Sequence, residues 1–235
     1  NWGIGLIFFS FMMYFIQALI FKDAKLLFQE LLAQLAYLPL YVFLNTIVIE
    51  QLLKRKEKAD MVKKINTVIG VFFSEMGKEL IGELIKFDLN FDNIKGEFTN
   101  DLEWTDQRII QLRETLKKYK SKIDSRNGDV LKIKILVDSK RQLLISFLNN
   151  PNILEHQVFT ELLFAIFHIG EEITQRIELN DLCQEDYKHL SIDIKRIYIL
   201  IIFQWISYME HLSKEYPYLY SLALKTNPFI VSKTK

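Results

Sequence analysis

The sequence "LLAQLAYLPLYVFLNTIVIE" occupies residues 31–50 and is followed at once by "QLLKRKEK", residues 51–58. Residues 31–49 of this run carry no formal charge, and apolar side chains fill nearly every position instead of one stripe. That all-round pattern is typical of a helix that faces lipid or lies deep in a protein core. This stretch therefore decides between a membrane protein and a soluble helical bundle.

A second uncharged run precedes it at residues 2–21, "WGIGLIFFSFMMYFIQALIF". A helix of that length rises about 30 Å, the thickness of the hydrocarbon core of a bilayer. The run lacks the basic start and the small-residue cleavage site of a signal peptide. We therefore expect a transmembrane hairpin with spans at about 2–21 and 31–49. The alternative is a soluble bundle whose apolar helices bury one another.

Basic residues on either side of the second run indicate its orientation. Two lysines lie between the runs, whereas six basic residues follow the second one before residue 65. Because cytoplasmic loops carry an excess of Lys and Arg, the second run is expected to end in the cytoplasm. The localisation predicted is the cytoplasmic (inner) membrane, with the bulk of the chain in the cytoplasm. The residues expected at the membrane surface are Lys54, Arg55, Lys56 and Lys58.

Composition favours long helices throughout. Half of the 235 residues are hydrophobic, with 18 Phe and 10 Tyr but only 8 Gly and 4 Pro to break helices. The net charge of +1 argues against a nucleic-acid partner. The single cysteine, Cys183, excludes an internal disulfide and a cysteine-rich zinc site. The predicted fold class is all-α, with a transmembrane hairpin at 1–53 and a cytosolic bundle of about five helices at 54–235.

Helical periodicity supports this bundle. Nothing breaks the chain between residues 49 and 60, so the second span is expected to continue into the cytosol as one long helix. The apolar run at 197–209 is too short for a span and predicts a buried core helix. Residues 87–101 are predicted to form a loop because they are rich in Asn and Asp. The helices expected after the hairpin lie at 61–87, about 100–122, 130–148, 155–179 and 185–216.

Catalytic motifs do not stand out. The chain lacks a Gly-rich phosphate loop, a G-x-S-x-G elbow and an H-E-x-x-H zinc motif, so neither an enzyme nor an organic cofactor is expected. A metal site is the one chemical alternative, because histidine and carboxylates recur at helical spacing in two neighbouring helices. Structural histidine and ion-paired carboxylates would show the same pattern. The candidate ligands are Glu161, His168, Glu172, His189 and Asp193.

Two further polar sets admit two interpretations each. Gln34, Asn45 and Glu50 mark either the place where spans pack or the lining of a pore. A carboxylate stripe on the following helix is either a cation vestibule or a face that answers a basic helix, because like charges at i, i+4 repel. This stripe consists of Glu75, Glu79 and Glu83.

The C-terminal tail is unusually aromatic. Residues 216–229 read "YPYLYSLALKTNPF", and we expect this segment to dock on its own bundle or on a neighbouring subunit. The longer stretch "HLSKEYPYLYSLALKTNPF" (211–229) resembles the end of a group of uncharacterised prokaryotic two-span membrane proteins with a cytosolic helical region. The resemblance implies a prokaryotic origin and this architecture. It implies no activity and transfers no functional residues.

Three hypotheses of function follow. The first is a membrane-anchored helical protein without catalytic chemistry, which assembles with itself or a protein partner and relays a signal along the long helix. The second is an oligomeric ion channel whose pore is lined by one span. The third is a metal-dependent oxidase or sensor built on the histidine and carboxylates. The partners expected are the lipid bilayer, further copies of the chain, and a protein bound through the bundle or the tail.

Overall fold

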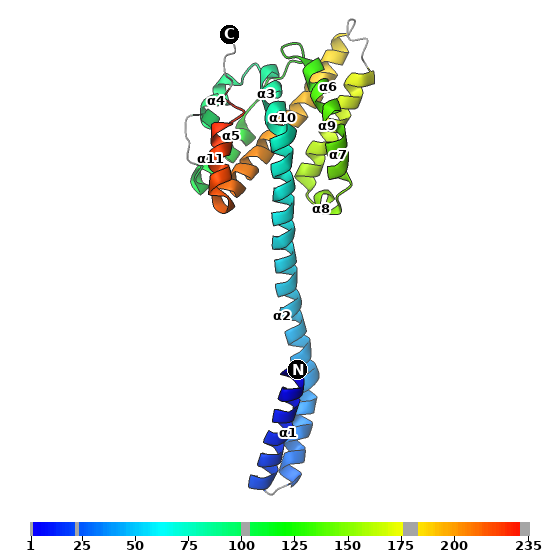
Figure 1. The fold of residues 1–235 in the computed structure, drawn as a ribbon, viewed down its shortest axis with the longest axis vertical. Coiled ribbons are helices and arrows are strands. Elements are labelled where there is room, and N and C mark those ends of the chain that lie inside the picture. Colours follow the sequence, from blue (N-terminus) through cyan, green and yellow to red (C-terminus); the bar gives the residue numbers. More distant parts are fainter. Residues whose placement is uncertain (1, 22–23, 100–103, 176–182, 231–235) are drawn as a thin grey trace. The chain divides into compact units, whose positions relative to one another are not determined.

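The computed structural model describes residues 2–21, 24–99, 104–175 and 183–230, and these residues are almost entirely helical (Figure 1). Within them, extended pairing is limited to an isolated bridge between Asp88 and Ile123. The predicted all-α class is therefore confirmed. The chain divides into two compact units, residues 1–59 and 60–235.

The first unit consists of α1 (Trp2–Phe21) and the first part of α2 (Ala24–Phe72), which lie side by side (Figure 1). Polar side chains join the two helices. The Tyr14 hydroxyl donates to Gln34 Oε1, and Gln17 Nε2 donates to Glu30 Oε2 at 2.7 Å. Most large apolar side chains of both helices are exposed. Such a surface is typical of a site that contacts another protein or a membrane.

Helix α2 confirms the expectation that the second apolar run continues as one long helix. It spans 49 residues and keeps Pro39 inside it. It also begins earlier than predicted, because the segment 24–30 holds good helix formers and neither Gly nor Pro. Among the described residues, one helical stretch is long and apolar enough to cross a membrane, and it begins at Phe28 of α2. Helix α1 contains a shorter apolar segment, Gly3–Gln17. The count of two spans thus stays a prediction.

The second unit begins with the end of α2. A π-helical turn (Phe73–Gly77) joins α2 to α3, and a 3₁₀ turn (Ile85–Phe87) ends the predicted 61–87 helix. The helices of this unit are α3 (Lys78–Leu84), α4 (Asp92–Thr99), α5 (Asp106–Lys118), α6 (Val130–Ser139), α7 (Arg141–Leu148), α8 (Pro151–Leu154), α9 (Gln157–Gln175), α10 (Gln184–Glu215) and α11 (Pro217–Lys225).

Helix α4 contradicts the loop predicted at 87–101. Its Ile94 and Phe98 lie four residues apart and are both buried, so one short apolar stripe outweighs the polar composition. The next helix was expected to start near Asn100, which lies outside the described residues. Helix α5 begins at Asp106, where the Thr105 hydroxyl caps it by accepting from the Arg108 amide. It ends at Lys118, four residues before the predicted end at 122.

The predicted helix at 130–148 is two helices. Its N-terminus is capped by the Asp129 carboxylate, but Lys140 leaves the helical conformation and separates α6 from α7. The interval between the helices predicted at 130–148 and 155–179 contains a single helical turn, α8, which Asn150 caps and Pro151 opens. Helix α9 agrees with the 155–179 prediction over 157–175, and its expected end lies outside the described residues. Helix α10 confirms the 185–216 prediction within one residue at each end.

Helix α10 lies at the centre of the second unit and packs against α3, α5, α9 and α11. The apolar run 197–209 is part of its buried face, as expected. Aromatic rings link the end of α2 to this helix. Phe73 meets Trp205 edge-on at 5.1 Å and stacks on Tyr208 at 5.1 Å, and Phe72 meets Phe159 of α9 edge-on at 5.4 Å. Such ring pairs add about 0.5–1.5 kcal/mol each to the burial of the side chains.

The C-terminal tail docks on its own bundle, the first of the two alternatives. Phe229 is fully buried and stacks on Phe98 of α4, with the ring centroids 4.2 Å apart. Asn227 Nδ2 donates to the Phe98 carbonyl at 2.8 Å, and the Tyr220 hydroxyl accepts from the Trp104 amide at 2.8 Å. These contacts give two of the tail's four aromatic residues, Phe229 and Tyr220, a partner in the bundle.

Candidate functional site

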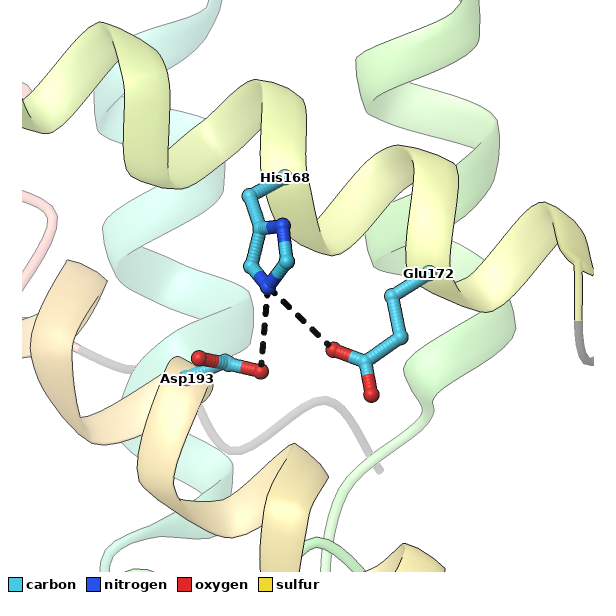
Figure 2. Close-up of side chains that lie close together, drawn as sticks. All are labelled: His168, Glu172 and Asp193. Carbon is cyan, nitrogen blue, oxygen red and sulfur yellow. Dashed lines mark ion pairs between the residues drawn. The ribbon is translucent and has the colours of Figure 1, made fainter.

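Two adjacent helices bring a histidine and two carboxylates together (Figure 2). His168 and Glu172 lie one turn apart on α9, and Asp193 comes from α10. His168 Nε2 lies 3.8 Å from Glu172 Oε2 and 3.8 Å from Asp193 Oδ2, and one ligand atom from each residue lies within 4.8 Å of the others. The imidazole is thus positioned between two carboxylates.

The two carboxylates of the cluster are largely buried, whereas the imidazole faces solvent. The carboxylate side chains retain 13% (Glu172) and 21% (Asp193) exposure, whereas the His168 side chain retains 66%. A nitrogen donor with two oxygen donors suits first-row divalent transition ions, whereas all-oxygen sites suit Ca²⁺ and Mg²⁺. The open side would leave coordination positions for water. The arrangement can therefore bind a divalent ion or serve as an ion-paired histidine.

The other two predicted ligands do not join the cluster. Glu161 Oε1 accepts from Gln157 Nε2 at 3.0 Å, within the first turns of α9. His189 is exposed on α10, one turn before Asp193, and is not part of the described group. Three of the five candidates therefore meet. The di-iron pattern of helical bundles needs two Glu-x-x-His pairs and two further Glu, which the described residues of this cluster do not supply.

Lysines form ion pairs with two members of the acidic stripe Glu75, Glu79 and Glu83, which was a candidate vestibule. Glu75 pairs with Lys140 at 2.9 Å, and Glu83 pairs with Lys86 at 2.7 Å. Glu79 and Glu83 line a cavity of about 200 Å³ together with lysines of α6 and its end. Glu75 is therefore paired with the residue that ends α6 and Glu83 with a lysine of the following turn, and these pairs reduce the repulsion within the stripe.

The polar residues of the second apolar run each have a partner inside the chain. Gln34 accepts from Tyr14 of α1, and Asn45 Nδ2 donates to the Tyr41 carbonyl of its own helix at 2.8 Å. Glu50 pairs with Lys54 at 2.7 Å. Gln34 thus marks a place where the two apolar helices pack. The basic residues Lys54, Arg55, Lys56 and Lys58 are exposed along α2.

A cavity of about 410 Å³ escaped the sequence analysis. The end of α2, the π-helical turn, α10 and α11 enclose it, so segments more than 100 residues apart form its walls. Its lining is mostly apolar, and its volume falls in the usual range for small-molecule sites. The aromatic residues around the end of α2, in α10 and in α11 are the only signal in the sequence that could have indicated this cavity. Polar groups that line it include Asn66, Ser74, Lys78, Tyr208 and His211.

Burial perturbs two of these groups. Burial raises the pKa of the Tyr208 hydroxyl above its usual range. Burial also lowers the pKa of the His211 imidazole, with Lys63 acting in the same direction and Glu215 against it. The indole of Trp205, in the same wall, is fully buried, and its Nε1 meets no hydrogen-bond acceptor among the described residues. The cavity wall therefore holds neutral donors in an apolar setting.

A buried polar network also escaped the sequence analysis. Asp88 is 6% exposed and accepts from the Tyr119 hydroxyl at 2.6 Å, from the Lys122 amide at 2.9 Å and from the Asn90 amide at 3.1 Å. Burial, together with the Asp88 charge, raises the pKa of both Tyr119 and the neighbouring Tyr198. This network ties the turn after α3 to the segment after α5, and we assign it to structure.

Comparison with known proteins finds matches to two helical domains of one family. The N-terminal helical domain of the MJ1433 family matches residues 1–53, and the C-terminal helical domain of uncharacterised protein MJ1433 matches residues 61–225. The chain belongs to this family. A curated relative is uncharacterised protein MJ1433 of Methanocaldococcus jannaschii, 38% identical over 227 residues that cover 97% of this chain and 91% of the relative. No solved structure matches the chain.

Proposed function

We propose that this chain is a membrane-anchored helical protein that assembles with further copies of itself and relays a signal along α2, without catalytic chemistry. The observation that carries the proposal is α2 itself. This single helix begins at Ala24, runs through the apolar stretch and ends at Phe72 in the core of the second unit. A helix is stiff enough to transmit a shift at one end to the other.

The surface of the first unit supports anchoring. Many large apolar side chains of this unit are exposed, and four of them retain 66–73% of their accessible surface: Phe8, Phe11, Phe15 and Tyr41. Exposed apolar area of this extent is rare on soluble monomers. The basic cluster that follows the second run favours a cytoplasmic second unit. Partnered polar residues in the run weaken the motive for the channel alternative.

The cavity at the end of α2 supports the relay. Asn66, Gly70 and Val71 of α2 form one wall, and the π-helical turn continues it. π-helical turns occur often at functional sites. A small molecule or protein segment held there would contact the last turns of α2 directly. Its binding energy would then be available to favour one state of the helix over another.

Anchoring is tested with the native Cys183, which is exposed. The full chain, expressed in cells, should stay in the membrane fraction after alkaline extraction. A membrane-impermeant maleimide should label Cys183 only after the cells are permeabilised, and Cys183→Ser should abolish the signal. Release of the chain by alkali would overturn the anchor, and labelling of intact cells would overturn the cytoplasmic placement.

Assembly and relay are tested by crosslinking. In a Cys183→Ser background, Asn45→Cys places one thiol in the apolar stretch, where disulfide formation between copies reports self-assembly. Ser74→Trp fills the cavity from its exposed edge and should change the crosslinking yield by at least twofold. Val62→Trp, at an exposed position outside the cavity, is the matched control and should leave the yield unchanged. Absence of any crosslink would refute assembly, and equal yields for Ser74→Trp and the control would refute the relay.

A further inference from the structure

The cluster of His168, Glu172 and Asp193 brings one nitrogen donor and two carboxylates together between two packed helices. From this geometry we infer that the chain binds one divalent first-row transition ion, such as Zn²⁺, between α9 and α10. The inference is independent of the proposed relay, because none of these residues lines the cavity at the end of α2.

The distances lie within the range of ion pairs but leave His168 without a hydrogen bond to either carboxylate. Both His168–carboxylate separations are 3.8 Å, beyond the range of a hydrogen bond. Metal–ligand bonds of about 2.1 Å place neighbouring ligands of a tetrahedral ion about 3.4 Å apart. The two His168 separations exceed this value by about 0.4 Å, and all three ligand atoms lie within 4.8 Å of one another.

The supporting helices are rigid, which a preformed site needs. The ligands come from the packed α9–α10 pair, and buried Ile169 and Ile173 flank the α9 ligands while buried Leu190 and Ile194 flank Asp193. Their register on each helix is therefore held by the core, and Figure 2 shows the three side chains converging across the gap between the helices. Sites on helices keep their geometry better than sites on loops.

Donor chemistry selects the ion. The imidazole nitrogen disfavours Mg²⁺ and Ca²⁺, which take oxygen ligands. Two carboxylates supply two negative charges to offset a dication, and no soft thiolate is present because the chain's single cysteine lies at the start of α10. Affinity should follow the usual order, in which Zn²⁺ exceeds Mn²⁺. With three protein ligands and an exposed imidazole, water would complete the coordination, so the ion should exchange freely.

Three near-isosteric variants test the site: His168→Gln, Glu172→Gln and Asp193→Asn. Purified full-length protein, stripped with a chelator, is titrated with Zn²⁺ by calorimetry, and the melting temperature is followed in parallel. The wild type should bind about one equivalent and melt at a higher temperature with Zn²⁺, whereas millimolar Mg²⁺ should have no effect. Each variant should lose at least tenfold in affinity, since even outer-shell changes cost that much.

Glu171→Gln is the matched control, because Glu171 precedes Glu172 on α9 but pairs with Arg141 on the other side. This control should bind Zn²⁺ as tightly as the wild type. Equal melting temperatures of all four variants without metal would show that the fold is intact. A wild type that binds less than about one-tenth of an equivalent would overturn the inference. So would variants that bind as the control does.

Discussion

Replacing Phe229 by alanine tests whether the C-terminal tail belongs to the folded core. Phe229 is fully buried, stacks on Phe98 at 4.2 Å and lies 6.4 Å from the ring of Phe91. Burial of a phenylalanine side chain contributes up to about 3 kcal/mol, and the stacked pair adds about 1 kcal/mol. Phe229→Ala should therefore lower the free energy of unfolding of the second unit by about 3–4 kcal/mol, as core Phe→Ala changes do.

The assay is guanidinium denaturation of the full chain, followed by tryptophan fluorescence. Two of the three tryptophans, Trp104 and Trp205, are buried in the second unit, so the signal reports chiefly on that unit. Tyr218→Ala is the control on the same tail, because Tyr218 is 86% exposed and should cost less than about 0.5 kcal/mol. If Phe229→Ala cost less than 1 kcal/mol, like the control, the tail would not be part of the core.

Further predictions concern α9, the cavity and the buried network. Gly170→Ala should destabilise by about 1–3 kcal/mol, because its Cβ would lie 2.7 Å from a valine of α6, whereas Gly82→Ala meets nothing and should stabilise by about 0.5–1 kcal/mol; denaturation midpoints of the two variants should move in opposite directions. The pKa of His211 is lowered from about 6.5, so the unfolded state binds its proton more readily and stability should fall as pH drops below 6.5; His211→Gln should flatten this part of the pH–stability curve, and an unchanged curve would contradict the burial argument. Tyr119→Phe removes a hydrogen bond to buried Asp88 and should cost about 1.5–3 kcal/mol by denaturation, so a neutral effect would show that the network is dispensable.

Local patterns predicted the helices whose buried face is long. The aliphatic and aromatic spacing of 185–216 gave α10 within one residue at each end, and the absence of breakers after Ile49 gave the continuity of α2. Short elements were missed, because α4 and α11 hold fewer than ten residues each and their stripes consist of one or two buried side chains. The break at Lys140 has no breaker residue in the sequence, so composition could not reveal it.

For the candidate site, too, local spacing predicted part of the arrangement and helix packing decided the rest. The spacing of His168 and Glu172 places both on one face of α9, as any four-residue interval does. Asp193 is 21 residues beyond Glu172, and its arrival at the cluster depends on how α10 packs against α9. Glu161 and His189 lie at equally suitable helical spacing for metal ligands, but neither belongs to the cluster. The cavity was beyond prediction for the same reason, since three distant segments form it.

The sequence by itself determined the helical class, the long apolar helix and the lack of familiar catalytic motifs, because these depend on charge, breakers and periodicity within about twenty neighbouring residues. Tertiary structure alone decided which polar side chains meet. Ridges of one helix settle into grooves of the next at angles set by all the side chains between them. One turn of slippage would separate Asp193 from His168, and nothing in the local sequence of either helix records that register.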